Sequence, residues 1–233
     1  MSFYLLDHPN PNGLSYSLTR GEPIRGIVLH TAENVADTIG PDGGAERVAS
    51  YGATTRRASW HVTVDKDSII YMLPDRMQAW HVVGYNSSTL GIEQACQASK
   101  WKEYPADWVD ATITNTATVV KQWCELYDIP MKRISRDEYD SGKRGILAHA
   151  DLDPSRRSDP GKDYPWDLLF EKMETDMTEF YIELEKLVTE SGGNARSLFY
   201  TLELLRGLAE GVSIPANVPR AVAEAVLSPK HTY

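Results

Sequence analysis

Residues 149–161 read HADLDPSRRSDPG, and this stretch says more about fold and function than any other part of the chain. It places the imidazole of His149 and the carboxylate of Asp159 ten residues apart, on a segment with prolines at positions 154 and 160. Proline fixes φ and removes a backbone donor, so a regular helix or a central strand is not expected there. We therefore predict a rigid loop that folds back and brings both side chains to one point.

A second histidine ends an apolar run far upstream. Residues 26–30 read GIVLH, a pattern that predicts a buried strand with His30 at its tip. Two histidines and one carboxylate form the ligand set of a catalytic zinc site that keeps an open fourth position. Asp151 and Asp153 also lie close to His149 in sequence, so they compete with Asp159 as the third ligand.

Composition limits the classes of function. The chain has 233 residues, of which 42 % are hydrophobic and 24 % charged, as is usual for globular proteins. Its formal net charge of −9 argues against a nucleic-acid binder, which needs a basic surface. No apolar run approaches the roughly 18–20 residues that span a bilayer, and no secretory signal is evident. We therefore expect that the protein does not insert into a membrane. We also expect that it is synthesised in a cytoplasm.

The two cysteines, Cys96 and Cys124, lie 28 residues apart and form no CxxC pair. Both fall in apolar segments, which favours two buried free thiols. A disulfide between them is the alternative.

Strand and helix patterns alternate along the first two thirds of the chain. Strands are expected at 24–31, at 90–96, at 145–149 and, as a hairpin, at 58–73; helices are expected at 42–55 and at about 107–127. Residues 1–23 are rich in Pro, Gly, Asn and Ser and predict an irregular lead-in. The alternation predicts an α/β domain with a central mixed β-sheet flanked by helices and a zinc site in a surface cleft at strand ends.

The character of the sequence changes after Trp166. We interpret residues 1–170 as the catalytic domain and residues 171–233 as a helical C-terminal appendage or linker. Its apolar residues recur at helical spacing: Phe180, Leu184, Leu187, Leu198, Leu202 and Leu205. Such stripes predict packing on the catalytic domain or on a second copy of the chain. The second arrangement would give a homo-oligomer through these helices. Recognition of a cell wall is the functional alternative.

Five pieces of the sequence, taken in order, resemble the zinc-dependent N-acetylmuramoyl-L-alanine amidases. This family includes phage lysozyme-type amidases and peptidoglycan-recognition proteins. The pieces are VLHT at 28–31, SWHV at 59–62, AWH at 79–81, Asn86 with LGIE at 90–93, and the loop at 149–161. The loop follows the family form His-x-Asp-apolar-x-Pro-x-Arg-basic-x-Asp-Pro-Gly throughout. The resemblance covers about residues 24–166, and the shared order makes it specific.

The resemblance implies roles for five residues. His30, His149 and Asp159 would hold Zn²⁺, and Glu93 would be the general base. Arg157 falls where many members carry lysine. Because arginine is not a practical proton donor, we expect it to stabilise the oxyanion by its charge alone.

Four further residues are candidates for binding substrate: Trp60, His61, His81 and Asn86. Trp60 stands where some phage members have a tyrosine thought to assist catalysis, and an indole N–H cannot do acid–base work. His61 is as readily a structural histidine, and Asn86 could simply close a turn. Asp151 is expected to orient His149 or cap the loop.

The implied function is hydrolysis of the amide between the lactyl group of N-acetylmuramic acid and L-alanine in peptidoglycan. A phage endolysin, made in the host bacterial cytoplasm and acting on the cell wall after release, is the leading interpretation. One alternative is a non-catalytic peptidoglycan-binding module of the same fold. Another is a bacterial cytoplasmic amidase that recycles soluble muropeptides. Because binding relatives typically lose the third zinc ligand, Asp159 together with Glu93 favours an enzyme.

Overall fold

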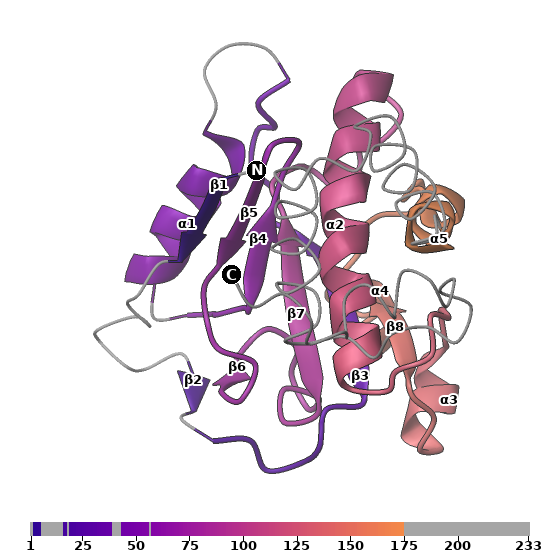
Figure 1. Ribbon diagram of the computed structural model, residues 1–233. Coiled ribbons are helices and arrows are strands. Elements are labelled where there is room, and N and C mark those ends of the chain that lie inside the picture. Colours follow the sequence, from indigo (N-terminus) through magenta and orange to yellow (C-terminus); the bar gives the residue numbers. More distant parts are fainter. Residues whose placement is uncertain (1, 6–15, 18, 39–42, 56, 175–233) are drawn as a thin grey trace, which may run out of the picture. The chain divides into compact units, whose positions relative to one another are not determined.

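The computed structural model describes residues 2–5, 16–17, 19–38, 43–55 and 57–174. In this part of the chain a six-stranded sheet has the order β1-β5-β4-β7-β3-β8 (Figure 1). Its strands are β1 (Ser2–Leu5), β3 (Gly26–Thr31), β4 (Val62–Val64), β5 (Ser68–Tyr71), β7 (Thr89–Gln94) and β8 (Gly145–Ala148). Neighbouring strands are parallel except for β4 and β5, which form an antiparallel pair. A smaller antiparallel sheet pairs β2 (Tyr16–Ser17) with β6 (Gln78–Ala79).

Strand β3 lies between β7 and β8 and is buried along its whole length. A parallel strand that is covered on both faces needs apolar residues at nearly every position, which explains the continuous run before His30. In the register, His30 pairs with Glu93 on β7, and Leu29 pairs with Ala148, the residue before His149. The carboxyl ends of these three strands therefore meet at one edge of the sheet.

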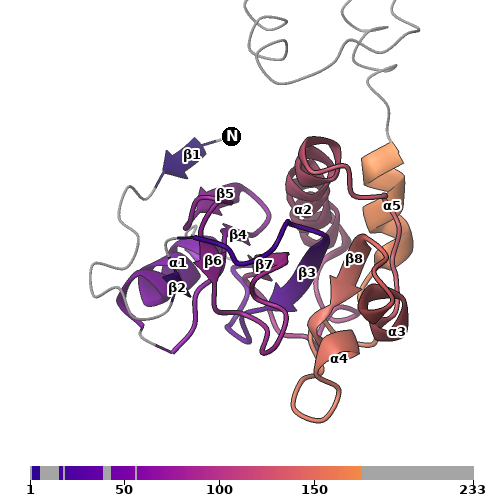
Figure 2. The same cartoon turned by 90° about the horizontal axis from the view of Figure 1, so that it is seen from below.

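Helices cover both faces of the sheet (Figure 2). They are α1 (Gly44–Thr54), α2 (Ala106–Leu126), α3 (Arg136–Asp140), α4 (His149–Leu152) and α5 (Trp166–Glu174). On one face, α2 and α5 pack on the sheet through the largest cluster, which includes Ile92, Trp123 and Leu169. On the other face, α1 packs over β5, while α3 and α4 pack over β3 and β8. The α/β class with a mixed central sheet flanked by helices is confirmed.

Two buried acidic residues have a structural task at the start of α1. Asp37 Oδ2 accepts hydrogen bonds from the backbone N–H groups of Gly43 and Gly44, and Asp65 Oδ2 accepts one from Ala45 at 2.6 Å. Carboxylates are favoured at a helix N-terminus because they satisfy its free N–H groups and its positive dipole end. These acidic side chains therefore cap the helix.

Several local predictions were wrong. Residues 1–23 are not irregular throughout, because they contain β1 and β2, which pair with the distant strands β5 and β6. The 149–161 segment begins with a helical turn, α4, in which Asp151 Oδ2 accepts the Ala148 N–H at 2.9 Å. Pro154 lies beyond that turn, so it does not prevent it. The short elements β6 and α3 were not predicted.

Three further expectations concern the cysteines, membrane-spanning helices and the C-terminal segment. Cys96 and Cys124 are both free and buried, as predicted. Among the described residues, no helix combines the length and apolar character needed to cross a membrane. The division at residue 170 stays a prediction, although α5 crosses it and buries Leu169 and Met173. The six apolar residues of the 171–233 segment named above lie outside the described residues.

A chain that ends at Glu174 keeps all of α5. We expect it to unfold cooperatively in urea, to bind zinc and to cleave a soluble muropeptide. A chain that ends at Leu168 loses Leu169 and Met173 from the core, and each such loss costs about 2–5 kcal/mol. A folded 1–174 protein that holds zinc yet leaves the muropeptide intact would contradict the assignment of the chemistry to this part of the chain.

Candidate metal centre and active site

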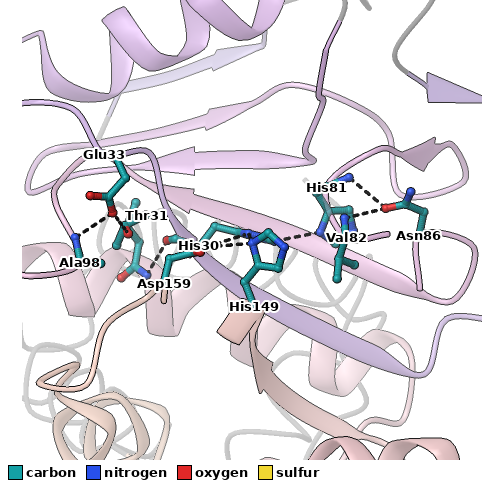
Figure 3. A network of polar contacts seen from close by, with 10 residues as sticks. His30, Thr31, Glu33, His81, Val82, Asn86, Ala98, His149 and Asp159 are labelled. Atoms are coloured by element: carbon teal, nitrogen blue, oxygen red, sulfur yellow. Dashed lines mark hydrogen bonds and ion pairs between the residues drawn. The ribbon is translucent and has the colours of Figure 1, made fainter. Parts of the chain in front are cut away.

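Three buried side chains converge at the carboxyl edge of the sheet (Figure 3). His30 lies near the end of β3, His149 begins α4 directly after β8, and Asp159 lies on the following loop. The Nδ1 atoms of the two histidines are 2.9 Å apart. Asp159 Oδ2 is 3.2 Å from His30 Nδ1 and 3.0 Å from His149 Nδ1. The three atoms thus form a nearly equilateral triangle.

This triangle fits a metal ion. Neutral imidazole nitrogens that lack a proton and a carboxylate oxygen are all electron-pair donors, so they repel one another unless a proton or a cation lies between them. A tetrahedral zinc ion with bonds of about 2.0–2.1 Å spaces its ligand atoms about 3.3 Å apart. The observed separations of 2.9–3.2 Å are close to that spacing, so His30, His149 and Asp159 could hold such an ion.

The other two candidate carboxylates face elsewhere. Asp151 caps the Ala148 N–H and forms an ion pair with Arg133 at 3.1 Å. Asp153 forms an ion pair with Arg156 at 2.5 Å. The structure therefore brings only Asp159, of these three acids, to the histidines.

Charge and burial set the protonation of the triangle. Burial lowers the pKa of His30 to about 4, although the neighbouring Asp159 carboxylate, which favours the protonated ring, opposes this shift. For Asp159, burial alone would raise the pKa, but the polar contacts of its carboxylate with His149 and His30 outweigh burial and bring the pKa below its usual value. Near neutral pH, His30 is therefore neutral and Asp159 is ionised, which are the forms that bind metals.

The loop that carries Asp159 is fixed on both sides. The Asp159 carbonyl accepts the Ala150 N–H at 2.9 Å, and the Pro160 carbonyl accepts the Trp101 indole N–H at 2.7 Å. The Asp159–Pro160 peptide bond is cis. Gly161 has a φ of +110°, and a Cβ there would lie 2.0 Å from the Ala98 carbonyl oxygen. Only glycine fits this position, which explains the Pro-Gly that follows Asp159.

Gln94 holds the backbone of His30 and was not predicted. Its Nε2–H donates to the His30 carbonyl at 3.1 Å, and its Oε1 accepts from Tyr164 at 3.1 Å and from Thr116 at 3.2 Å. The side chain is fully buried. A polar residue in a buried strand was the available signal, since buried polar groups need partners.

Glu93 lies beside His30 in the register of β3 and β7. Its Oε2 is buried and has no hydrogen-bond partner among the described residues. Burial, followed by the negative charge of Asp159, raises its pKa well above the usual value, while the charge of Arg157 opposes that shift. Arg157 is itself exposed, so its charge acts on the site from the solvent side.

Trp60 and His61 lie in the core. The Trp60 side chain is 4 % exposed, packs with α1 in the cluster that contains Val48 and Ile70, and donates its indole N–H to Thr63 at 2.6 Å. His61 is fully buried, and its Nδ1 accepts the Gly91 N–H at 3.0 Å. Both side chains are buried, and Trp60 lines a small cavity together with Tyr16, Gly52 and Met72. Their roles in substrate binding stay predictions.

His81 and Asn86 lie on the loop between β6 and β7 (Figure 3). Asn86 Oδ1 accepts the backbone N–H groups of His81 at 2.9 Å and Val82 at 2.7 Å, so its carboxamide closes the turn. The His81 ring is buried, with Nδ1 2.9 Å from His30 Nε2. Burial, followed by the charge of His30, brings the pKa of His81 well below its usual value.

Arg20 fixes this loop and was also missed, because it lies in the segment expected to be irregular. Its guanidinium donates to the backbone carbonyls of Asn86 at 3.2 Å, Ser87 at 3.3 Å and Thr89 at 2.9 Å. Burial lowers its pKa to about 10, which leaves the group charged at neutral pH. One half-buried cation thereby donates to several carbonyl groups of the loop.

The sequence of the chain matches one known protein family. The family described as N-acetylmuramoyl-L-alanine amidase matches residues 20–162, more than half of the chain. The chain belongs to the N-acetylmuramoyl-L-alanine amidase family. It is therefore an enzyme of that type, and the matched range contains every residue of the triangle, together with Glu93 and Arg157.

Solved structures agree on the fold of this amidase. A mutant structure of PlyL is similar with a TM-score of 0.51 and 20 % identity, covering 76 % of this chain and 100 % of that one. The Staphylococcus aureus hydrolase AmiA, in complex with its ligand, is similar with a TM-score of 0.51 and 16 % identity, covering 83 % and 86 %. No curated protein sequence matched the chain. At these identities the two structures support the fold alone.

Gly161→Ala should weaken the metal centre. The new Cβ combines a left-handed φ with the contact to the Ala98 carbonyl, so we expect a loss of more than about 2 kcal/mol in the free energy of unfolding. Gly142→Ala is the matched control, since Gly142 has a φ of +95° and open space around its Cβ position. Urea unfolding and zinc content measure both effects. Equal losses in the two variants would show that the Ala98 contact does not position Asp159.

Proposed function

We propose that this amidase is zinc-dependent and that His30, His149 and Asp159 hold the ion. The observation that carries this proposal is the triangle of two Nδ1 atoms and one Oδ2 with sides of 2.9, 3.0 and 3.2 Å. Two imidazoles and a carboxylate leave a tetrahedral ion one open position, as in catalytic rather than structural zinc sites. When bound, the ion supplies Lewis-acid chemistry that polarises a carbonyl group and makes water a stronger nucleophile near neutral pH.

Glu93 is the proposed general base. It lies beside His30 at the sheet edge, and its Oε2 has no competing partner among the described residues. Its carboxylate accepts a proton from the attacking water and delivers it to the nitrogen of the leaving L-alanine, which completes the hydrolysis of the amide.

Arg157 is proposed to stabilise the negative charge that develops on the carbonyl oxygen. Because arginine is not a practical proton donor, its contribution is electrostatic. A fixed donor at such an oxygen typically contributes about 3–4 kcal/mol to transition-state stabilisation. Its place on the loop that carries Asp159, two residues before that carboxylate, supports this role.

The proposed biological role is that of a phage endolysin, which acts on the host cell wall after release from the cytoplasm. The support is the resemblance of the motifs, including the complete form of the 149–161 loop, to phage lysozyme-type amidases. An endolysin cleaves intact sacculi, whereas a recycling amidase prefers soluble muropeptides. Parallel digestion of both substrates therefore separates the two roles.

Digestion of purified peptidoglycan tests the reaction. We expect new L-alanine amino termini by mass spectrometry and no new reducing sugar ends. Removal of zinc with a chelator should abolish release, and added zinc should restore it. His30→Ala should lose both zinc and activity because one of three ligands is removed. New reducing ends without new amino groups would identify a glycosidase instead.

Glu93→Gln should retain zinc and stability but reduce turnover by about 10²–10⁴, because the carboxamide cannot accept the proton. The matched control is Glu103→Gln, which changes an exposed carboxylate paired with Lys100 and should keep normal turnover. Single-turnover kinetics with zinc-loaded protein measures the effect. Near-normal turnover in Glu93→Gln would remove Glu93 from the mechanism.

A further inference from the structure

A chain of buried hydrogen bonds leads away from the metal centre on the far side of His30. His30 Nε2 lies 2.9 Å from His81 Nδ1. His81 Nε2 lies 3.2 Å from Thr89 Oγ1, which donates to the Tyr85 carbonyl at 2.8 Å. His30 is 2 % exposed, His81 9 % and Thr89 0 %. Solvent therefore has little access to these links.

The direction of this chain is fixed by its last member. A carbonyl oxygen only accepts, so the Thr89 hydroxyl proton points to Tyr85. Thr89 Oγ1 can then only accept from His81, which places the ring proton of His81 on Nε2. His81 Nδ1 carries a lone pair and accepts from His30 Nε2–H. By elimination, the lone pair of neutral His30 is on Nδ1, the atom that faces His149 and Asp159.

We propose that Thr89 and His81 are positioning residues that fix His30 in the Nε2–H tautomer and so keep Nδ1 free to bind the metal. This inference rests on the proposed zinc site. Metal-binding histidines usually donate their second N–H to a carboxylate, a carbonyl or water, which fixes the ring. Here the imidazole of His81 accepts the second N–H of His30. The N–H of His81 in turn donates to Thr89, whose hydroxyl donates to the Tyr85 carbonyl.

The neutral relay has an electrostatic consequence. A carboxylate in the place of His81 would add a negative charge next to His30. The imidazole adds none, so Asp159 remains the one carboxylate in contact with the two histidines among the described residues. Less of the ion's positive charge is then compensated, which favours the polarisation of a substrate carbonyl.

The surrounding structure holds the relay in place. A Cβ at position 91 would lie 2.6 Å from His81 Nδ1, so Gly91 lets the imidazole lie against β7. Asn86 fixes the backbone N–H of His81, and Arg20 fixes the carbonyl of Thr89. These contacts give Gly91, Asn86 and Arg20 a shared task in keeping the relay rigid. Within the relay, both ring nitrogens of His81 are engaged, by His30 and by Thr89, so neither is available to a substrate.

The tautomer can be measured without metal or substrate. Long-range ¹H–¹⁵N NMR of the metal-free protein distinguishes the two neutral tautomers of each histidine. We expect the Nε2–H form for His30 and His81 in the wild type and in Thr89→Ser, which keeps the hydroxyl. In Thr89→Val, both rings should show a mixture. An Nδ1–H form of His30 in the wild type would overturn the proposal, as would an unchanged Nε2–H form in Thr89→Val.

Zinc affinity provides the second readout, by competition with a chelator in the full chain. Thr89→Val should bind zinc about 10–100-fold more weakly, and Thr89→Ser nearly normally. Thr112→Val is the matched control, because Thr112 lies on α2 and its buried hydroxyl has no hydrogen-bond partner in the described part of the chain. An equal loss in Thr89→Val and Thr112→Val would overturn the relay. A wild type that binds no zinc would instead refute the proposed metal site, while the NMR measurement would still decide the tautomer.

Discussion

The site of this amidase depends above all on the parallel pairing of β3 with β7 and β8. Parallel strands end at the same edge of a sheet, and here that edge receives His30, Glu93 and the start of α4 with His149. Burial of these strands on both faces holds the register, because a slip of one residue would exchange the side chains that pack into the two different core clusters on either side of the sheet. The chemistry of the enzyme thus relies on a backbone arrangement stabilised mainly by apolar packing.

A second constraint is that the buried polar groups around the site must find partners. Gln94, Thr89 and Arg20 donate hydrogen bonds to backbone carbonyl groups of neighbouring segments. Each unpaired buried group would cost about 1–3 kcal/mol, so these bonds hold the loops in one arrangement. The result is a candidate metal centre whose three side chains are oriented by the surrounding hydrogen bonds.

The acidic charge of the chain does not conflict with an oxyanion-stabilising role at the site. The formal charge of −9 is spread over the whole chain, while Arg157 lies on the loop that carries Asp159. Local charge acts over a few ångströms, and salt screens the rest within about 8–10 Å. Family membership fixes the type of enzyme, and the local arrangement of Glu93, Arg157 and the triangle supports the roles proposed for them.

The sequence alone determined the α/β class, the strands at 26–31, 89–94 and 145–148, and the long helix α2, because continuous apolar runs and helical spacing are local signals. The ordered motifs also pointed to the amidase family and to His30, His149 and Asp159. Only the tertiary structure could show that β1 and β2 pair with distant strands, that Trp60 and His61 are buried, and that Asn86 closes a turn. It alone revealed Arg20, Thr89 and Gln94 as supports of the site. Their roles depend on hydrogen bonds between segments far apart in sequence, and the partners of such bonds are chosen by the packing of the whole chain.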